Sequence, residues 1–216
     1  MSSLTVVRHA QARPFEKNPD SLSELGQKQS RLLGEFWKSS GAEFDEVWCG
    51  SLNRHCQTAE IALKALGWWG TPHMAGEFNE YDAEGMLRGY PPPSSFPDNR
   101  AFQKVFEAAM AKWIHSESLG GEGAGESFSA FHARVLRGLR MIQEGGSNRR
   151  VLLFTSGGPI GVLVQTALGA PDRSFADVNW RVRNCSITEF VFSADRLSLD
   201  SFNNVSHFDP AFRTFR

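Results

Sequence analysis

The sequence predicts a single three-layer α/β/α domain, with a mainly parallel sheet and a helical and loop elaboration over its site. Short apolar, β-branched segments alternate along the chain with longer amphipathic segments, which is typical of parallel strands joined by helices. Several apolar segments end directly before polar or glycine residues that open the next helix. The 216 residues are enough to bury the core of one such domain, and we expect it to span 1–216.

The first part of the chain alternates strand and helix twice. The segment LTVVRH, residues 4–9, is apolar and β-branched and predicts the first strand. Ser23 can cap the following helix, whose apolar stripe ends near Gly41. FDEVWCGS, residues 44–51, predicts a second strand, and RHCQTAEIALKALG, residues 54–67, predicts a helix that starts just past it.

Residues 80–125 interrupt this alternation. The proline-rich segment GYPPPSSFPDN at 89–99 is incompatible with a regular helix or strand, and it introduces a helix predicted over about 100–115. GGEGAGES at 120–127 predicts a flexible link. We expect residues 80–125 to lie over the site as a lid that sets substrate specificity.

The last part of the chain returns to the alternating pattern. VLLF at 151–154 predicts a buried strand, and a tight turn, TSGG, leads from it to a helix that opens at Pro159. Alternating residues at 184–192 and 196–203 predict two final strands. Before them, apolar residues at three- and four-residue spacing predict one more helix, marked by Phe128, Phe131, Val135, Leu139 and Ile142.

Composition excludes several classes of protein. The formal net charge of −1 disfavours a nucleic-acid binder, which would be distinctly basic. No apolar stretch approaches the length that spans a membrane, and MSSLTVVRHA does not have the pattern of a signal peptide. Three cysteines without C-x-x-C spacing indicate a reduced, cytoplasmic location. No residues show the spacing of metal ligands, so we expect neither a metal nor a cofactor.

Chemistry-bearing residues follow three predicted strands at the point where each strand ends. These are Arg8-His9, Ser51 with Arg54, and the turn at 156–158. Parallel neighbours would bring them to one edge of the sheet, although each motif alone is common at protein surfaces. Arginine forks match phosphate oxygens, and an imidazole among arginines has a lowered pKa and stays nucleophilic. The combination predicts a site that attacks a phosphoryl group and carries it as phosphohistidine.

Several segments together resemble one known family. LTVVRHAQA, LSELGQKQS, WCGSLNRHCQTAEIA, FNEYDAEG, GES and VLLFTSGGPI are similar, in this order, to the motifs of the histidine phosphatase superfamily, in its phosphoglycerate-mutase-like branch. NCSIT and SFNNVSHF extend the resemblance toward the end of the chain. The resemblance implies a phosphomonoester hydrolase whose partner is a small phosphoester or inorganic phosphate. It leaves open the physiological substrate, the balance of mutase and phosphatase activity, and the oligomeric state.

The resemblance assigns a role to each matching position. His9 would be the nucleophile that accepts the phosphoryl group, and Arg8 and Arg54 would clamp its oxygens. Glu80, directly before the pair Tyr81-Asp82, would donate a proton to the leaving oxygen. We expect the nearby Glu77 to be a surface charge.

The sequence departs from the family pattern at the second catalytic histidine, which falls on Ser156. With Gly157, this residue would still bind phosphate oxygens, but a serine brings no charge. A charge-assisted hydrogen bond contributes about 1.5–3 kcal/mol, so its loss predicts a step slowed by roughly 10- to 150-fold. Ala10 and Ala12 also replace residues of the first motif, which makes a glycolytic mutase less favoured. His55 directly follows Arg54, and we expect it at the surface or behind the site.

Two other functions are compatible with the sequence. A non-catalytic phosphate-binding pseudoenzyme would explain the loss of the second histidine. A serine hydrolase could use Ser156 as its nucleophile, but Phe154 occupies the first glycine position of the G-x-S-x-G signature. Three arginines in FHARVLRGLR raise the possibility of nucleic-acid binding, and a solvated helix face accounts for them better; they are Arg134, Arg137 and Arg140.

Overall fold

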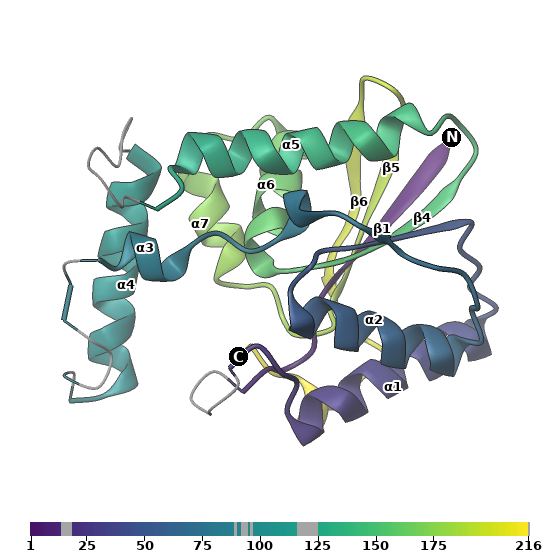
Figure 1. Ribbon diagram of the computed structural model, residues 1–216, viewed down its shortest axis with the longest axis horizontal. Helices are drawn as coiled ribbons and strands as arrows, with labels where there is room; N and C mark the ends of the chain where they lie inside the picture. The colour runs from purple at the N-terminus through teal and green to yellow at the C-terminus, as the bar shows by residue number, and fades with distance from the viewer. Residues whose placement is uncertain (14–18, 89, 92–94, 96, 116–124, 216) are drawn as a thin grey trace.

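A six-stranded sheet forms the centre of the protein, with strand order β3-β2-β4-β1-β5-β6 (Figure 1). We describe it from a computed structural model. The structure describes residues 1–13, 19–88, 90–91, 95, 97–115 and 125–215.

The sheet is parallel on one side and antiparallel on the other. Its parallel part contains β3 (His73–Met74), β2 (Glu46–Cys49), β4 (Arg150–Thr155) and β1 (Ser2–Arg8). Two strands, β5 (Ile187–Phe192) and β6 (Leu197–Asn204), extend it with antiparallel pairing. The predicted mainly parallel α/β sheet is therefore confirmed.

Helices cover both faces of this sheet (Figure 1). On one face, α1 (Glu24–Ser40) and α2 (Asn53–Leu66) bury an apolar cluster against alternate strand residues such as Val7 and Leu152. On the other face, α5 (Phe128–Glu144) and α6 (Gly157–Leu168) pack against the intervening residues. This alternation follows from the two-residue repeat of a strand, which sends successive side chains to opposite faces.

The first helix shows how local sequence sets the element boundaries. Ser23 Oγ accepts a hydrogen bond from the Gly26 N–H at 3.0 Å, which satisfies one of the free donors at the start of α1. The helix ends at Gly41, whose φ of 68° is left-handed and favours glycine. Both boundaries agree with the prediction.

Strand register brings the predicted site residues to one edge. Arg8 at the end of β1 pairs with Thr155 at the end of β4, and Cys49 of β2 pairs with Phe154. The next residue of β1, His9, donates its N–H to the Thr155 carbonyl at 2.8 Å. The residues after β1, β2 and β4 therefore meet at the carboxyl ends of three adjacent parallel strands.

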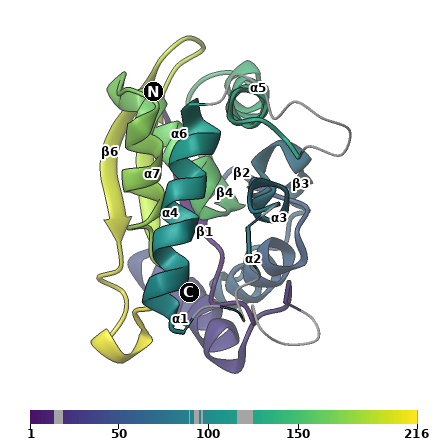
Figure 2. The same ribbon diagram turned by 90° about the vertical axis from the view of Figure 1, so that its left-hand side faces the viewer.

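Two further helices lie beyond this edge. The short α3 (Ala83–Met86) and the longer α4 (Asn99–His115) stand to the left of the sheet in Figure 1, and Figure 2 shows α4 from the side. Of these, α4 contacts α7 (Arg173–Asn179). Two 3₁₀ turns complete the described elements, at Gly76–Phe78 and Pro210–Phe212.

Some predicted boundaries differ from the structure. Helix α6 begins at Gly157 rather than at Pro159, which lies in its first turn. The strand expected from residue 184 begins at Ile187, because Cys185 has a φ of 51° within a turn. Three short elements, β3, α3 and α7, are too short to show a hydrophobic period and were not predicted. The flexible link at 120–127 falls mostly outside the described residues.

Candidate active site

His9 has its two ring nitrogens in distinct roles. Nδ1 lies 2.8 Å from the carbonyl oxygen of Ala10, which can only accept, so Nδ1 carries the proton. Nε2 accepts a hydrogen bond from Nε of Arg54 at 3.2 Å. Burial, together with the charges of Arg54 and Arg8, holds the pKa of His9 well below its usual range. The ring is therefore neutral at pH 7, with a lone pair on Nε2.

Arg54 is held in place by Asp20, a residue that sequence reasoning missed. One terminal nitrogen of Arg54 donates to Oδ1 of Asp20 at 2.6 Å. Oδ2 of Asp20 accepts the N–H of Asn53 at 2.7 Å and so caps the start of α2. A lone aspartate in a polar loop gave no signal for this role.

Arg8 lies at the last position of β1, directly before His9. Its guanidinium donates to the carbonyl of Val182 and lines the same cleft as His9. The side chain of Asn184 donates to the His9 carbonyl at 3.1 Å, which fixes the end of the strand. Together Arg8 and Arg54 place two permanent positive charges beside His9.

Glu80 lies in the same cleft, where its carboxyl group is partly buried. Its Oε1 accepts the N–H of Gly158 at 3.0 Å and that of Tyr81 at 3.2 Å. Burial raises the pKa of Glu80, although the charges of Arg54 and Arg8 partly oppose the shift. A carboxyl group with a raised pKa retains a proton that it can donate to a leaving group.

Ser156 contacts His55, which sequence reasoning placed at the surface or behind the site. Both side chains are completely buried, and His55 Nε2 lies 2.6 Å from Ser156 Oγ. The ring of His55 lies 5.6 Å from that of His9, centroid to centroid. The surface alternative is therefore wrong, and the location behind the site is correct. Gly50 makes room for the ring, because a Cβ there would come within 2.2 Å of Nδ1.

The cleft brings together four of the six predicted site residues. It has a volume of about 450 Å³ and is lined at one end by Arg8, His9, Arg54 and Glu80. Among the described residues that line it, neither Ser156 nor Gly157 occurs; they lie behind the surface of the cleft. Gly157 is the first residue of α6, where the N–H has no acceptor within the helix. A phosphate-binding role for these two residues stays a prediction.

The apolar part of the cleft lining comes from the segment predicted as a lid. Tyr81, Leu87, Phe102 and Phe106 belong to it, and the acidic Glu84 lines the cleft as well. Two other aromatic residues near this segment in the sequence belong to the core: Phe78 is buried in it, and Tyr90 packs against it.

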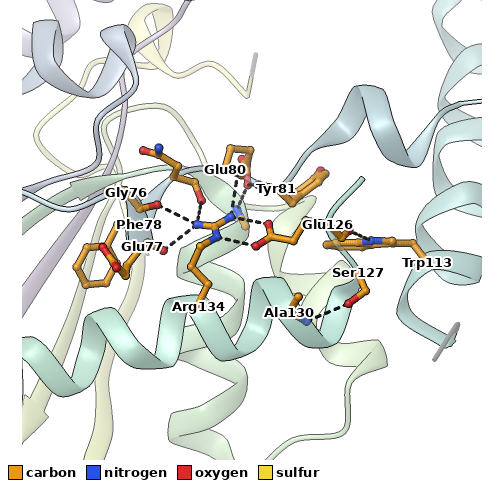
Figure 3. A network of polar contacts seen from close by, with 12 residues as sticks. Gly76, Glu77, Phe78, Glu80, Tyr81, Trp113, Glu126, Ser127, Ala130 and Arg134 are labelled. Atoms are coloured by element: carbon orange, nitrogen blue, oxygen red, sulfur yellow. Dashed lines mark hydrogen bonds and ion pairs between the residues drawn. The ribbon is translucent and has the colours of Figure 1, made fainter. Parts of the chain in front are cut away.

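Arg134 fixes the segment that carries Glu80 (Figure 3). One of its nitrogens donates to the carbonyl oxygens of Gly76 at 3.0 Å and Glu77 at 2.9 Å. Two others donate to the carboxylate of Glu126, each at 2.7 Å. The predicted solvated helix face is therefore wrong for Arg134, whereas Arg137 and its neighbour Arg140 are exposed. The pattern could not show this, because the partners come from distant segments.

Three other kinds of feature can be checked among the described residues: a metal cluster, a membrane-spanning helix and a serine hydrolase triad. The described residues contain no group of three or more His, Cys, Asp or Glu side chains placed to hold a metal ion. Within the same part of the chain, no helix combines the length and the apolar character needed to cross a membrane. No described carboxylate hydrogen-bonds to Nδ1 of His55, as the third member of a serine hydrolase triad would.

The sequence is similar to those of phosphoglycerate mutases. The chain is 41% identical over 71 residues to a phosphoglycerate mutase of Candida albicans, but this covers 30% of the chain and only 29% of that protein. It is 28% identical over 184 residues to a 2,3-bisphosphoglycerate-dependent phosphoglycerate mutase of Methylorubrum extorquens, covering 81% of the chain and 83% of that protein.

Solved structures and a family model extend this similarity to almost the whole chain. A phosphoserine phosphatase variant of Entamoeba histolytica in complex with phosphoserine superposes with a TM-score of 0.69 and 19% identity, over 96% of this chain and 99% of that one. The model of the histidine phosphatase superfamily, branch 1, matches residues 4–205. Because this match covers most of the sequence and the superposed fold is the same, the chain belongs to the histidine phosphatase superfamily.

Proposed function

We propose that the protein is a phosphomonoester hydrolase that acts through a phosphohistidine on His9. One observation carries the proposal: Nε2 of His9 has a lone pair in a cleft that also holds Arg8, Arg54 and the carboxyl group of Glu80. A nucleophile, two cations and a proton donor are the groups that phosphoryl transfer requires.

The reaction follows from these positions in two steps. Nε2 of His9 attacks phosphorus, the bond from phosphorus to the leaving oxygen breaks, and Glu80 gives its proton to that oxygen. The Glu80 carboxylate then takes a proton from a water molecule that attacks the phosphohistidine, which releases phosphate and restores the neutral imidazole. Arg8 and Arg54 offset the negative charge on the phosphoryl oxygens in both steps.

The cleft favours substrates with an apolar leaving group. Of the described residues that line it, only Arg8 and Arg54 carry a positive charge, and both lie beside His9. The rest of the described lining includes Phe102, Phe106 and the carboxylate of Glu84, so it offers no further cation to a carboxylate on the leaving group. We therefore propose a small phosphomonoester of an apolar or aromatic alcohol, in preference to a phosphorylated hydroxy acid.

A panel of phosphomonoesters tests this function directly. Wild-type protein should hydrolyse aryl and alkyl phosphates, and His9→Ala should reduce kcat/KM to the background rate. Acid-labile, base-stable labelling of His9 after rapid quench would identify the intermediate. Full activity of His9→Ala would contradict the mechanism. Anion binding to wild type without turnover would instead support the pseudoenzyme.

The contact between Ser156 and His55 is the one observation that favours a serine hydrolase. A hydroxyl and an imidazole 2.6 Å apart have the spacing of a nucleophile and its base. However, both side chains are completely buried, and no described carboxylate orients the imidazole. A fluorophosphonate probe should therefore leave Ser156 unlabelled. Labelling of Ser156 without protection by vanadate would favour the hydrolase.

The proposal extends to the organisation of the chain. We assign residues 1–216 to one domain located in the cytoplasm, with 80–125 as the segment that sets specificity. Its described part supports this role, since Leu87, Phe102 and Phe106 line the same cleft as His9.

A further inference from the structure

The imidazole of His55 is buried between Ser156, which it contacts, and the nearby ring of His9. Its Nε2 lies 2.6 Å from Ser156 Oγ, and its ring lies 5.6 Å from the ring of His9. Since Arg8 pairs with Thr155 in the parallel sheet, the next residues, His9 and Ser156, are neighbours across the two strands. His55 therefore lies behind both the nucleophile and the hydroxyl beside it.

Burial of two polar side chains in contact requires a compensating interaction. A buried hydroxyl or imidazole without a partner would cost about 1–3 kcal/mol. Ser156 does not use its hydroxyl to cap α6, although it occupies the N-cap position. Its described partner is His55, so the hydroxyl is oriented by the imidazole.

We propose that His55 is a positioning residue that acts through Ser156. Nε2–H of His55 donates to Ser156 Oγ, and the hydroxyl proton of Ser156 is then directed at an oxygen of the phosphoryl group on His9. In the family pattern the residue at position 156 is a histidine. Here the imidazole belongs to His55 of α2, and Ser156 links it to the phosphoryl group by donating the hydrogen bond. This inference rests on the proposed function, because it assigns a residue to the same phosphoryl site.

The electrostatic surroundings of His55 fit a neutral donor. Burial, followed by the charge of Arg54, holds the pKa of His55 well below its usual range, and the backbone of Gly50 opposes this shift. Arg54, on the same helix, is the charged group that acts on His55. Arg8 acts on the neighbouring His9. A neutral imidazole has one protonated nitrogen. Nδ1 of His55 has no hydrogen-bond partner among the described residues, so we assign this proton to Nε2, which faces Ser156.

The packing also predicts that Ser156→His alone will not increase turnover. A histidine at position 156 would have to share the space of an imidazole that already approaches to 2.6 Å. We therefore expect no gain in turnover from Ser156→His while His55 is present. Removing His55 at the same time would free that space for the new ring.

A double-mutant cycle tests the pair. His55→Ala and Ser156→Ala should each lower kcat/KM for a phosphomonoester by about 10- to 100-fold, with weaker inhibition by vanadate. The double variant His55→Ala/Ser156→Ala should be no worse than either single variant, because the two groups act as one unit. The exchange variant His55→Ala/Ser156→His should regain at least about 10-fold over His55→Ala. His73→Ala, which changes an exposed histidine of β3 outside the 80–125 segment, is the matched control.

Three results would overturn the inference. These are full activity of His55→Ala, losses that multiply in the double variant, and an exchange variant that folds but regains nothing. His55→Gln keeps the volume and a donor, so it replaces His55→Ala in the cycle if that variant does not fold, and it should retain more activity than any smaller residue. Melting curves for every variant separate loss of fold from loss of function.

Vanadate binding separates this inference from the proposed function. If wild-type protein neither hydrolyses phosphomonoesters nor binds vanadate in calorimetry, the phosphoryl site itself is refuted and the inference falls with it. If wild type binds vanadate, the ¹⁵N imidazole signals of His55 should shift on binding. Unchanged His55 signals, together with unchanged affinity in His55→Ala, would refute only the role of His55.

Discussion

The Nε atom of Arg54 donates a hydrogen bond to Nε2 of His9 across 3.2 Å, while a terminal nitrogen of the same guanidinium binds Asp20 at 2.6 Å. The guanidinium of Arg54 therefore contacts the ring nitrogen that we propose as the nucleophile. A phosphoryl group bonded to Nε2 would take over this hydrogen bond through one of its oxygens. Because the planar guanidinium has several N–H donors, Arg54 can keep its hydrogen bond to Asp20 while it binds the phosphoryl group.

Arg54→Lys should lower kcat/KM for phosphomonoesters by about 10- to 100-fold, which corresponds to roughly 1.4–2.7 kcal/mol. A lysine keeps the charge but offers a single ammonium group that cannot serve both Asp20 and the phosphoryl oxygens. Steady-state kinetics beside Arg31→Lys, an exposed arginine of α1, provide the check. Equal activity of both variants would show that only the charge of Arg54 matters.

Glu80→Gln should slow the hydrolysis of alkyl phosphates by about 10²–10⁴-fold, the usual contribution of general acid catalysis. Hydrolysis of p-nitrophenyl phosphate should change by less than about 10-fold, because this leaving group departs with little protonation. The ratio of the two losses is the decisive measurement. Equal losses on both substrates would mean that Glu80 supports the fold through Gly158 rather than donating a proton.

The pH dependence of the same reactions follows from the two shifted groups. Burial raises the pKa of Glu80, so its proton, and with it alkyl phosphate hydrolysis, is lost only as pH rises through that raised value. The pKa of His9 is lowered, so the nucleophile stays neutral to well below pH 6.5. The descending limb of the pH–rate profile should disappear in Glu80→Gln, and an unchanged limb would assign it to another group.

Arg134→Ala should lower the free energy of unfolding by about 2 kcal/mol, because Glu126 loses its charged partner. This corresponds to a Tm lower by about 4–8 °C in a chain of this size. The segment that carries Glu80 also loses its carbonyl contacts, so kcat for alkyl phosphates should fall in the fraction that remains folded. Arg137→Ala removes an exposed arginine from the same helix and should change neither quantity.

His207 should make the protein less stable in acid. Burial is the largest cause of its pKa of about 4 in the folded state, and Phe36 and Phe208 contact its ring. The unfolded chain takes up this proton near pH 6.5, so unfolding binds protons between pH 6.5 and 4, and stability falls as pH falls. The loss from this group should reach up to about 2 kcal/mol at pH 5.

Urea unfolding at pH 7 and pH 5 measures this effect. His207→Gln should show a smaller decrease in stability between the two pH values than wild type. Part of the decrease should remain, because the pKa values of His9 and His55 are lowered in the same direction. An identical decrease in wild type and His207→Gln would show that His207 does not contribute.

Much of the candidate site could be predicted because its chemistry follows strand ends. Apolar segments define where β1, β2 and β4 stop, and parallel pairing brings the next residues to one edge whatever the details of packing. Only this rule was needed to predict that the site contains His9, Arg8 and Arg54. Glu80 came from the resemblance to a family motif; the structure places its carboxyl group beside the Gly158 N–H, and its role as proton donor stays a prediction.

The sequence by itself determined the α/β class, the parallel core and the residues that follow its strands, because hydrophobic periodicity and strand-end position are local properties. Only the tertiary structure decided the partners of His55 and Arg134. His55 meets Ser156, which lies 101 residues away, because β2 and β4 are adjacent in the sheet. A periodic pattern shows which helix face is apolar, but the polar partner of a side chain depends on which distant segment packs against it.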